Sequence, residues 1–133
     1  MKVRDLMNEK PATLTAQASL ADALDLMAKQ KLRHVVILDG AQLPVGIVSD
    51  RDLAMVYDPA AISEGRWKQT TVVQVMTADP ITVGSGTEVQ AAAKLLLQHA
   101  VSALPVLDNG QLVGILSEKD FVRYFARGKP EQA

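Results

Sequence analysis

An internal repeat limits the possible folds of this chain more than any other feature of its sequence. The pattern Met7-x3-Pro11-x-Thr13 recurs as Met76-x3-Pro80-x-Thr82, an offset of 69 residues (76 − 7). After one extra turn residue in the first copy, residues 45–53 align with residues 113–121, and five of these nine pairs are identical. All matches keep one order with a single gap, so we interpret the chain as a tandem duplication.

Each copy predicts the same order of elements: strand, helix, strand, turn, strand, helix. Apolar runs bounded by turn residues predict the strands. Ser19 with Asp22, and Thr87 with Gln90, have the spacing of helix capping boxes. The strands are predicted at 12–15, 35–38 and 45–48 in the first copy and at 81–83, 104–107 and 113–116 in the second, and the final helices start near Ser49 and Ser117 and extend towards Tyr57 and Arg127.

These elements predict an α/β fold with four segments along the chain. The first repeat covers residues 1–57, a connector follows at 58–71, the second repeat covers 72–127, and 128–133 form a flexible tail. The connector carries the single tryptophan, Trp67, which indicates an ordered segment. Each repeat alone is too short for a comfortable core, so we expect the two to pack together.

Composition excludes several classes of function. The 133 residues have a formal net charge of −1, which leaves no broad basic field for nucleic acid. The chain has no cysteine and two histidines, so neither a thiol nucleophile nor a Cys- or His-rich metal site can be assembled. No apolar run reaches the length of a membrane span, and charges occupy the start where a secretion signal is apolar. We expect a cytoplasmic protein with no membrane or nucleic-acid partner, and no catalytic or metal-ligating residues.

The ordered motifs, found twice, resemble a tandem pair of CBS (cystathionine β-synthase) domains from Val3 to about Arg127. This resemblance implies two β-α-β-β-α repeats packed through their sheets as one pseudo-twofold module. It also implies an adenosine-containing ligand (AMP, ADP or ATP, or S-adenosylmethionine or NAD) bound in clefts between the repeats. Pairs of this kind often form homodimers and regulate a protein partner, as in the sensing of cellular energy. No other cofactor is implied.

The segment from Gly46 to Asp52 is the most informative part of the candidate site. Ser49 stands where a helix begins and offers a hydroxyl beside unpaired backbone N–H groups, which suits a phosphate. Asp52, one turn later, can accept hydrogen bonds from both ribose hydroxyls. Ser117 and Asp120 take the same places in the second copy. The resemblance assigns the same roles, but Ser-x-x-Asp is also a capping box that needs no ligand, and both roles can coexist.

Apolar residues of the strands are the candidates for an adenine pocket, in which the backbone of the first strand contacts the base. For the individual side chains, membership of the core is the better interpretation. The candidates are Thr13, Leu14, Val35 and Ile47 in the first copy and Thr82, Val83, Leu104, Pro105 and Ile115 in the second.

Basic residues make the two candidate sites unequal. Arg33 and His34 precede a buried strand, where similar proteins place a side chain that reaches a ligand phosphate. A solvated helix end explains them equally well. The second copy has the uncharged Ser102 and Ala103 there, so occupancy of both sites is open. Gly84-Ser85-Gly86 lacks the further residues of a phosphate loop, and we interpret it as a strand-to-helix turn.

The sequence thus predicts a stand-alone regulatory module that binds an adenosine-containing ligand and acts in trans on an unidentified protein. The alternative is an interaction or oligomerisation scaffold that ignores nucleotides and uses its Ser-x-x-Asp motifs only as helix caps. The residues do not identify which adenosine compound is bound, because all of these ligands share the group that the motif contacts.

Overall fold

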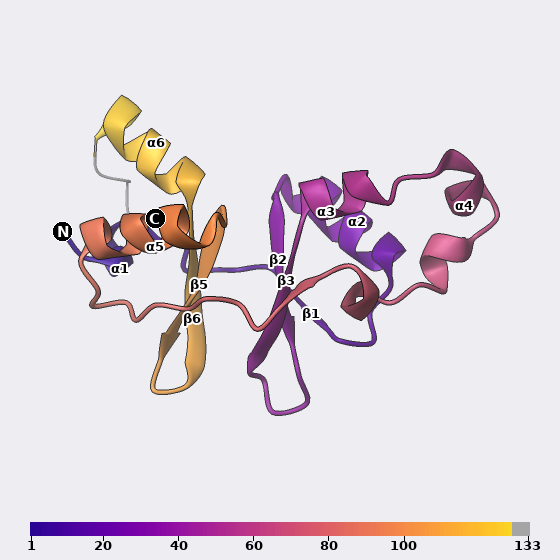
Figure 1. The fold of residues 1–133 in the computed structure, drawn as a ribbon, viewed down its shortest axis with the longest axis horizontal. Coiled ribbons are helices and arrows are strands. Elements are labelled where there is room, and N and C mark those ends of the chain that lie inside the picture. The colour runs from indigo at the N-terminus through magenta and orange to yellow at the C-terminus, as the bar shows by residue number, and fades with distance from the viewer. Residues whose placement is uncertain (129–133) are drawn as a thin grey trace. The chain divides into compact units, whose positions relative to one another are not determined.

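The computed structural model describes residues 1–128 and confirms a mixed α/β architecture (Figure 1). Two compact units divide the chain. The first unit is Ala12–Pro80, and the second unit combines Met1–Pro11 with the chain from Ile81 onward. The predicted tail at 128–133 falls, apart from Gly128, outside the described residues.

The first unit is built on a four-stranded sheet in the order β1-β2-β3-β4. β1 runs parallel to β2, and the other neighbours are antiparallel. Apolar residues of α2 and α3 pack on one face of this sheet with Val35, Ile37 and Val48. The unit contains β1 (Thr13–Thr15), α2 (Leu20–Gln30), β2 (His34–Leu38), β3 (Pro44–Ser49), α3 (Asp50–Met55), α4 (Pro59–Ser63), the 3-10 turns η1 (Arg66–Lys68) and η2 (Val72–Gln74), and β4 (Thr77–Ala78).

The second unit repeats this plan around the hairpin of β5 and β6. Single bridges extend the hairpin on both sides: Val83 pairs in parallel with Val106, and Asn8 pairs antiparallel with Ile115. The predicted strand at 81–83 is therefore reduced to one bridging residue. The elements are α1 (Val3–Leu6), α5 (Val89–His99), β5 (Ala103–Asp108), β6 (Gln111–Ser117) and α6 (Glu118–Arg127).

The compact units divide the chain differently from the sequence repeats, because the leading segment of each repeat packs in the other unit. Val3 and Leu6 are buried in the core that contains Leu104 and Leu116. Val72, which aligns with Val3, is buried in the core of the first unit. Burial of a few apolar side chains on each segment thus joins the two halves of the chain.

The helix starts confirm one predicted capping box and correct the other. The Ser19 hydroxyl accepts from the Asp22 backbone N–H at 3.1 Å, and the Asp22 carboxylate accepts from the Ser19 N–H at 3.0 Å. Thr87 is not the cap of α5, because the helix begins after Glu88. Lys2 bridges to Glu88, and the Met1 carbonyl accepts the Val89 N–H. A distant segment therefore satisfies the helix end that the local pattern had assigned to Thr87 and Gln90.

The connector is ordered, in agreement with the interpretation of its tryptophan. Asp58 caps α4, with Pro59 at the first helical position. Trp67 is only 5% exposed and joins the core of the first unit. Its ring meets Tyr57 edge to face, with ring centres 6.4 Å apart.

Within residues 1–128, no helix has the length and hydropathy that crossing a bilayer requires.

Candidate functional site

Strand register places four predicted side chains of the first repeat, together with Val36, on one sheet face, opposite α2 and α3. Thr13 is the register partner of Val36, which is the partner of Ile47. His34 is the partner of Ser49. Because side chains alternate along a strand, Thr13, His34, Val36, Ile47 and Ser49 share this face. We call them, with Asp52 on the adjoining helix, the first-repeat site.

The second repeat places the matching residues in the same way. Pro105 is the register partner of Ile115, and Ala103 is the partner of Ser117. Thr82 precedes the bridge residue Val83 and so lies on the opposite face from it. We call Thr82, Ala103, Pro105, Ile115 and Ser117, with Asp120, the second-repeat site.

Four predicted pocket residues lie on the other face of their sheets. Val35 is fully buried in the core of the first unit, and Leu14 packs against the same core. Val83 and Leu104 belong to the core of the second unit. The interpretation as core is thus confirmed for Val35, Val83 and Leu104, whose side chains are buried, whereas Leu14 is only partly buried.

Ser49 and Asp52 form a closed capping box at the start of α3. The Ser49 hydroxyl accepts from the Asp52 N–H at 3.1 Å, and Asp52 Oδ2 accepts from the Ser49 N–H at 2.8 Å. This arrangement holds the half-buried carboxylate beside the end of β3. The Arg33 carbonyl accepts the Asp50 N–H, and the Asp50 carboxylate accepts the Arg51 N–H. The predicted unpaired N–H groups beside Ser49 are therefore occupied, which leaves the serine hydroxyl proton as the donor for an anion.

Asp120 has a different environment from Asp52. Its Oδ2 accepts from the Ser117 N–H at 2.8 Å and from the Ser117 hydroxyl at 3.3 Å. Its Oδ1 accepts from the Arg123 guanidinium at 3.4 Å. Asp120 is 7% exposed and is the single charged residue buried within the described part of the chain. Burial raises the pKa of Asp120 against the opposing effects of Ser117 and Arg123.

Asp120→Asn should raise the melting temperature by a few degrees at neutral pH and change it little in acid. A raised pKa means that the folded state binds the proton more tightly. The stability linked to Asp120 is therefore fully present below the ordinary pKa of 3.8 and is lost as pH rises through the raised pKa. Asparagine avoids the cost of a buried charge. Thermal melts of both proteins across this pH range measure the difference, and a less stable variant at neutral pH would show that the ionic contacts outweigh burial.

The basic residue predicted to reach a phosphate is engaged in an ion pair. Arg33 Nε donates to Asp50 Oδ2 at 3.0 Å, and both side chains are about half exposed. In the second repeat the Glu118 N–H donates to the Ser102 carbonyl, just as the Asp50 N–H donates to the Arg33 carbonyl in the first. A serine side chain, however, cannot form the ion pair that Arg33 makes. The predicted inequality of the two sites is present in the charges around them.

Two groups of residues beside the sites were not predicted. Thr77 is the register partner of Ile47 on β4, and Asn8 is the bridge partner of Ile115. The offset of 69 residues between the repeats makes Asn8 and Thr77 equivalent positions. Nothing in the sequence, however, indicates that Asn8 pairs with β6 and Thr77 with β3. Arg123 beside Asp120 has no counterpart in the first repeat, where Met55 aligns with it.

The segment Gly84-Ser85-Gly86 is a turn, as predicted. The Asp108 carboxylate accepts from both the backbone N–H and the hydroxyl of Ser85. These hydrogen bonds lower the pKa of Asp108. The polar groups that a phosphate loop needs are thus used within the turn.

Two of the hollows in the described residues belong to the first unit. One, of about 450 Å³, includes Thr13 and Leu14 at the end of β1. The larger, of about 570 Å³, lies between α2, α3 and Trp67 and is almost entirely apolar. None of the predicted site residues lines the larger hollow, so hollow size does not identify the site.

Among residues 1–128, no group of His, Cys, Asp and Glu side chains is arranged to hold a metal ion.

Comparisons with known proteins support the fold and the duplication. The CBS domain matches twice, over residues 3–58 and 72–127. The CBS domain-containing protein YhcV of Bacillus subtilis is 28% identical over 118 residues, which are 89% of this chain and 81% of YhcV. By contrast, the chain spans about a quarter of the length of the homoserine O-acetyltransferases that it matches.

Solved structures with the same fold contain adenosine compounds. The CBS domain pair of protein MJ0100, in complex with 5′-methylthioadenosine and S-adenosylmethionine, is 26% identical with a TM-score of 0.80, covering 95% of this chain and 96% of that one. CBSX2 in complex with AMP is 30% identical with a TM-score of 0.78, covering 95% of this chain and 96% of CBSX2.

Proposed function

The chain belongs to the CBS domain family, and from that premise we propose that it is a regulatory module that binds an adenosine-containing ligand. Neighbours of the same fold bind AMP, S-adenosylmethionine and 5′-methylthioadenosine. Of these, AMP is the first candidate, because the AMP complex has the higher sequence identity. The module regulates a protein partner according to occupancy and does not itself catalyse a reaction.

One observation carries this proposal: the shared face of the first-repeat site. Within the described residues, Asp52 Oδ1 accepts no hydrogen bond, and it lies beside the row formed by Thr13, Ile47 and Ser49. We assign Asp52 to the ribose hydroxyls and Ser49 to the phosphate. The adenine base lies along Thr13 and Ile47, with main-chain groups of β1 at its edge. Arg33 and His34 lie near enough to the Ser49 end of the row to approach a phosphate.

Asp52→Ala should reduce AMP affinity at the first-repeat site about a hundredfold or more, because two hydrogen bonds to a charged group are lost. Calorimetric titration measures this affinity. Asp120→Ala should do the same at the second-repeat site. The matched control is Asp22→Ala, which breaks an equivalent capping box at the start of α2. If Asp52→Ala and Asp22→Ala bind AMP alike, the Ser-x-x-Asp motif is only a helix cap.

Thermal unfolding with AMP, ADP, ATP, S-adenosylmethionine and NAD then identifies the ligand. A compound at 100 times its dissociation constant should add about 2.7 kcal/mol to the free energy of unfolding. A selective shift with one compound is the expected result. No shift with any of them at millimolar concentration would contradict the proposal.

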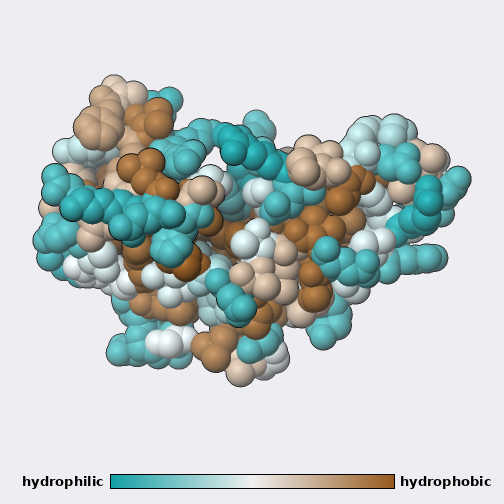
Figure 2. Space-filling model, in the orientation of Figure 1, coloured by the Kyte–Doolittle hydropathy of each residue, from teal (hydrophilic) through white to brown (hydrophobic). Residues whose placement is uncertain are grey.

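A scaffold without a ligand is the second candidate, and exposed apolar side chains favour it. Leu97 on α5 and Val122 and Phe125 on α6 are 64–83% exposed. Figure 2 shows hydrophobic surface where α6 lies in Figure 1. Such a surface fits pairing with a second copy, and we propose a homodimer in either case. Light scattering tests the homodimer, and the thermal unfolding series separates the candidates, because a dimer that no nucleotide stabilises is the scaffold.

A further inference from the structure

The two ribose carboxylates differ in how many hydrogen bonds they can still accept. A carboxylate has about four acceptor positions on its two oxygens. Within residues 1–128, Asp52 uses one of them, for the Ser49 N–H. Asp120 uses three, for the N–H and hydroxyl of Ser117 and for Arg123. A ribose donates two hydroxyls, so Asp52 can accept both while Asp120 has room for one.

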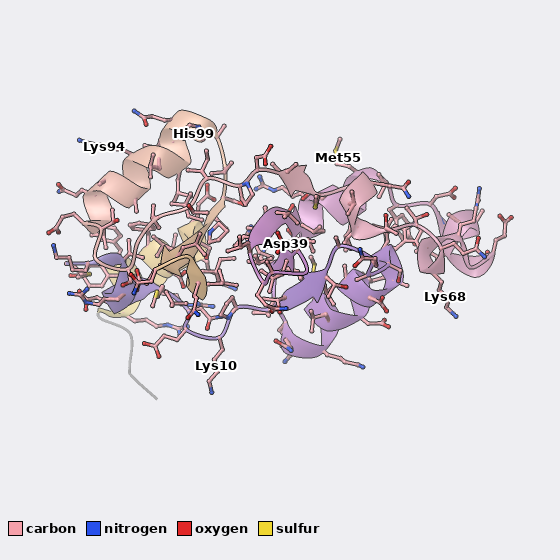
Figure 3. The ribbon with its side chains drawn as sticks, turned by 90° about the horizontal axis from the view of Figure 1, so that it is seen from below. Lys10, Asp39, Met55, Lys68, Lys94 and His99 are labelled. Carbon is pink, nitrogen blue, oxygen red and sulfur yellow. The ribbon has the colours of Figure 1, made fainter. Side chains whose placement is uncertain are left out.

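Two of the contacts at Asp120 are not found at Asp52, and they come from the Ser117 hydroxyl and from Arg123. Both repeats have the serine, so Arg123 is the residue by which they differ. The serine N–H is donated in both repeats as part of the helix cap. Met55, at the position that corresponds to Arg123, is 86% exposed and projects from α3 away from the unit (Figure 3). Arg123 instead folds back along α6 onto the carboxylate three residues earlier, with its side chain 52% exposed. Because half of the guanidinium side chain remains in water, this contact can open at small cost.

We propose that Arg123 is a latch on the second-repeat site, which a nucleotide must displace, so that ligand fills the first-repeat site before the second. This inference rests on the proposed function of both carboxylates. The latch gives one chain two sites of different affinity from nearly the same motif. A module of this kind responds over a wider range of ligand concentration than one with two equal sites.

The test isolates each site and exchanges the two residues. Asp52→Ala leaves only the second-repeat site, and adding Arg123→Met should tighten AMP binding about threefold to tenfold. Asp120→Ala leaves only the first-repeat site, and adding Met55→Arg should weaken AMP binding by a similar factor. The matched control is Arg127→Met, which removes the same charge one turn further along α6. Calorimetric titration with AMP measures every dissociation constant.

The sign of the change separates a latch from simple charge attraction. Loss of any cation weakens the attraction of an anionic nucleotide, so Arg127→Met should weaken AMP binding slightly or leave it unchanged. The latch predicts the opposite sign for Arg123→Met. Equal or weaker AMP binding by Asp52→Ala/Arg123→Met than by Asp52→Ala overturns the latch, whereas the proposed function fails only if wild type and both single-site proteins bind none of the adenosine compounds.

A ligand-free measurement tests the contact itself. Arg123 opposes the rise in the pKa of Asp120, so Arg123→Met should raise that pKa further. Carboxyl-carbon NMR titration of the free protein measures it. An unchanged pKa would show that Arg123 does not hold the carboxylate in solution, and this result would overturn the latch whether or not a nucleotide binds.

Discussion

Trp67→Ala should cost about 3–5 kcal/mol of the free energy of unfolding, because it removes a large aromatic side chain from a packed core. Trp67 is 5% exposed and packs among residues of the first unit's core, with Tyr57 against its edge. Chemical denaturation followed by circular dichroism measures the loss. The connector would then be part of the fold and not a spacer between repeats.

Trp67→Phe is the matched control, since it keeps an aromatic ring at the site and should lose less than half as much stability. Tyr57 is 60% exposed, so Tyr57→Ala should also cost far less. A loss below about 1 kcal/mol for Trp67→Ala would contradict the packing of the connector on the first unit.

Gly114→Ala should cost about 2–3 kcal/mol, the upper half of the usual range for overpacking. A Cβ at this position would lie 2.8 Å from the Asn8 carbonyl oxygen and 2.7 Å from Met7 Sδ. The Asn8 backbone cannot move away freely, because it exchanges two hydrogen bonds with Ile115. Denaturant midpoints of the variant and wild type measure the loss.

Gly46→Ala is the informative comparison. The three atoms nearest to its Cβ would all belong to the Met76 side chain, which can adopt another rotamer. Met76→Ala should therefore recover much of the stability lost in Gly46→Ala, whereas Met7→Ala should recover little in Gly114→Ala. Equal recovery in both pairs would show that the Asn8 backbone is not the obstacle.

Much of the local structure was predictable because its causes lie within a few residues. The buried strands β2 and β5 follow from continuous apolar runs, and Ser19, Ser49 and Ser117 begin helices with an aspartate three residues later. The cap of α5 was predicted at Thr87 and is wrong, because the residue that satisfies the helix end belongs to the N-terminal segment.

The sequence indicated which residues to consider for the candidate site, but only partly which of their side chains share one face of the sheet. Alternation along the strands separates Thr13 and Ile47 from Leu14 and Val35, and only strand register decides which face is covered by helices. Arg123 could not be recognised, since an arginine one turn after an aspartate on a helix is common on solvated surfaces.

The sequence alone determined the duplication, the order of elements in each repeat and the helix caps that hold Asp52 and Asp120, because periodicity and capping act over one or two helical turns. Tertiary structure decided the rest. It placed Val3 in the core of the second unit and Val72 in the core of the first, and it put Asn8 and Thr77 beside the sites. Such contacts join residues far apart in the chain, and their stability comes from apolar burial and strand pairing that no local pattern records.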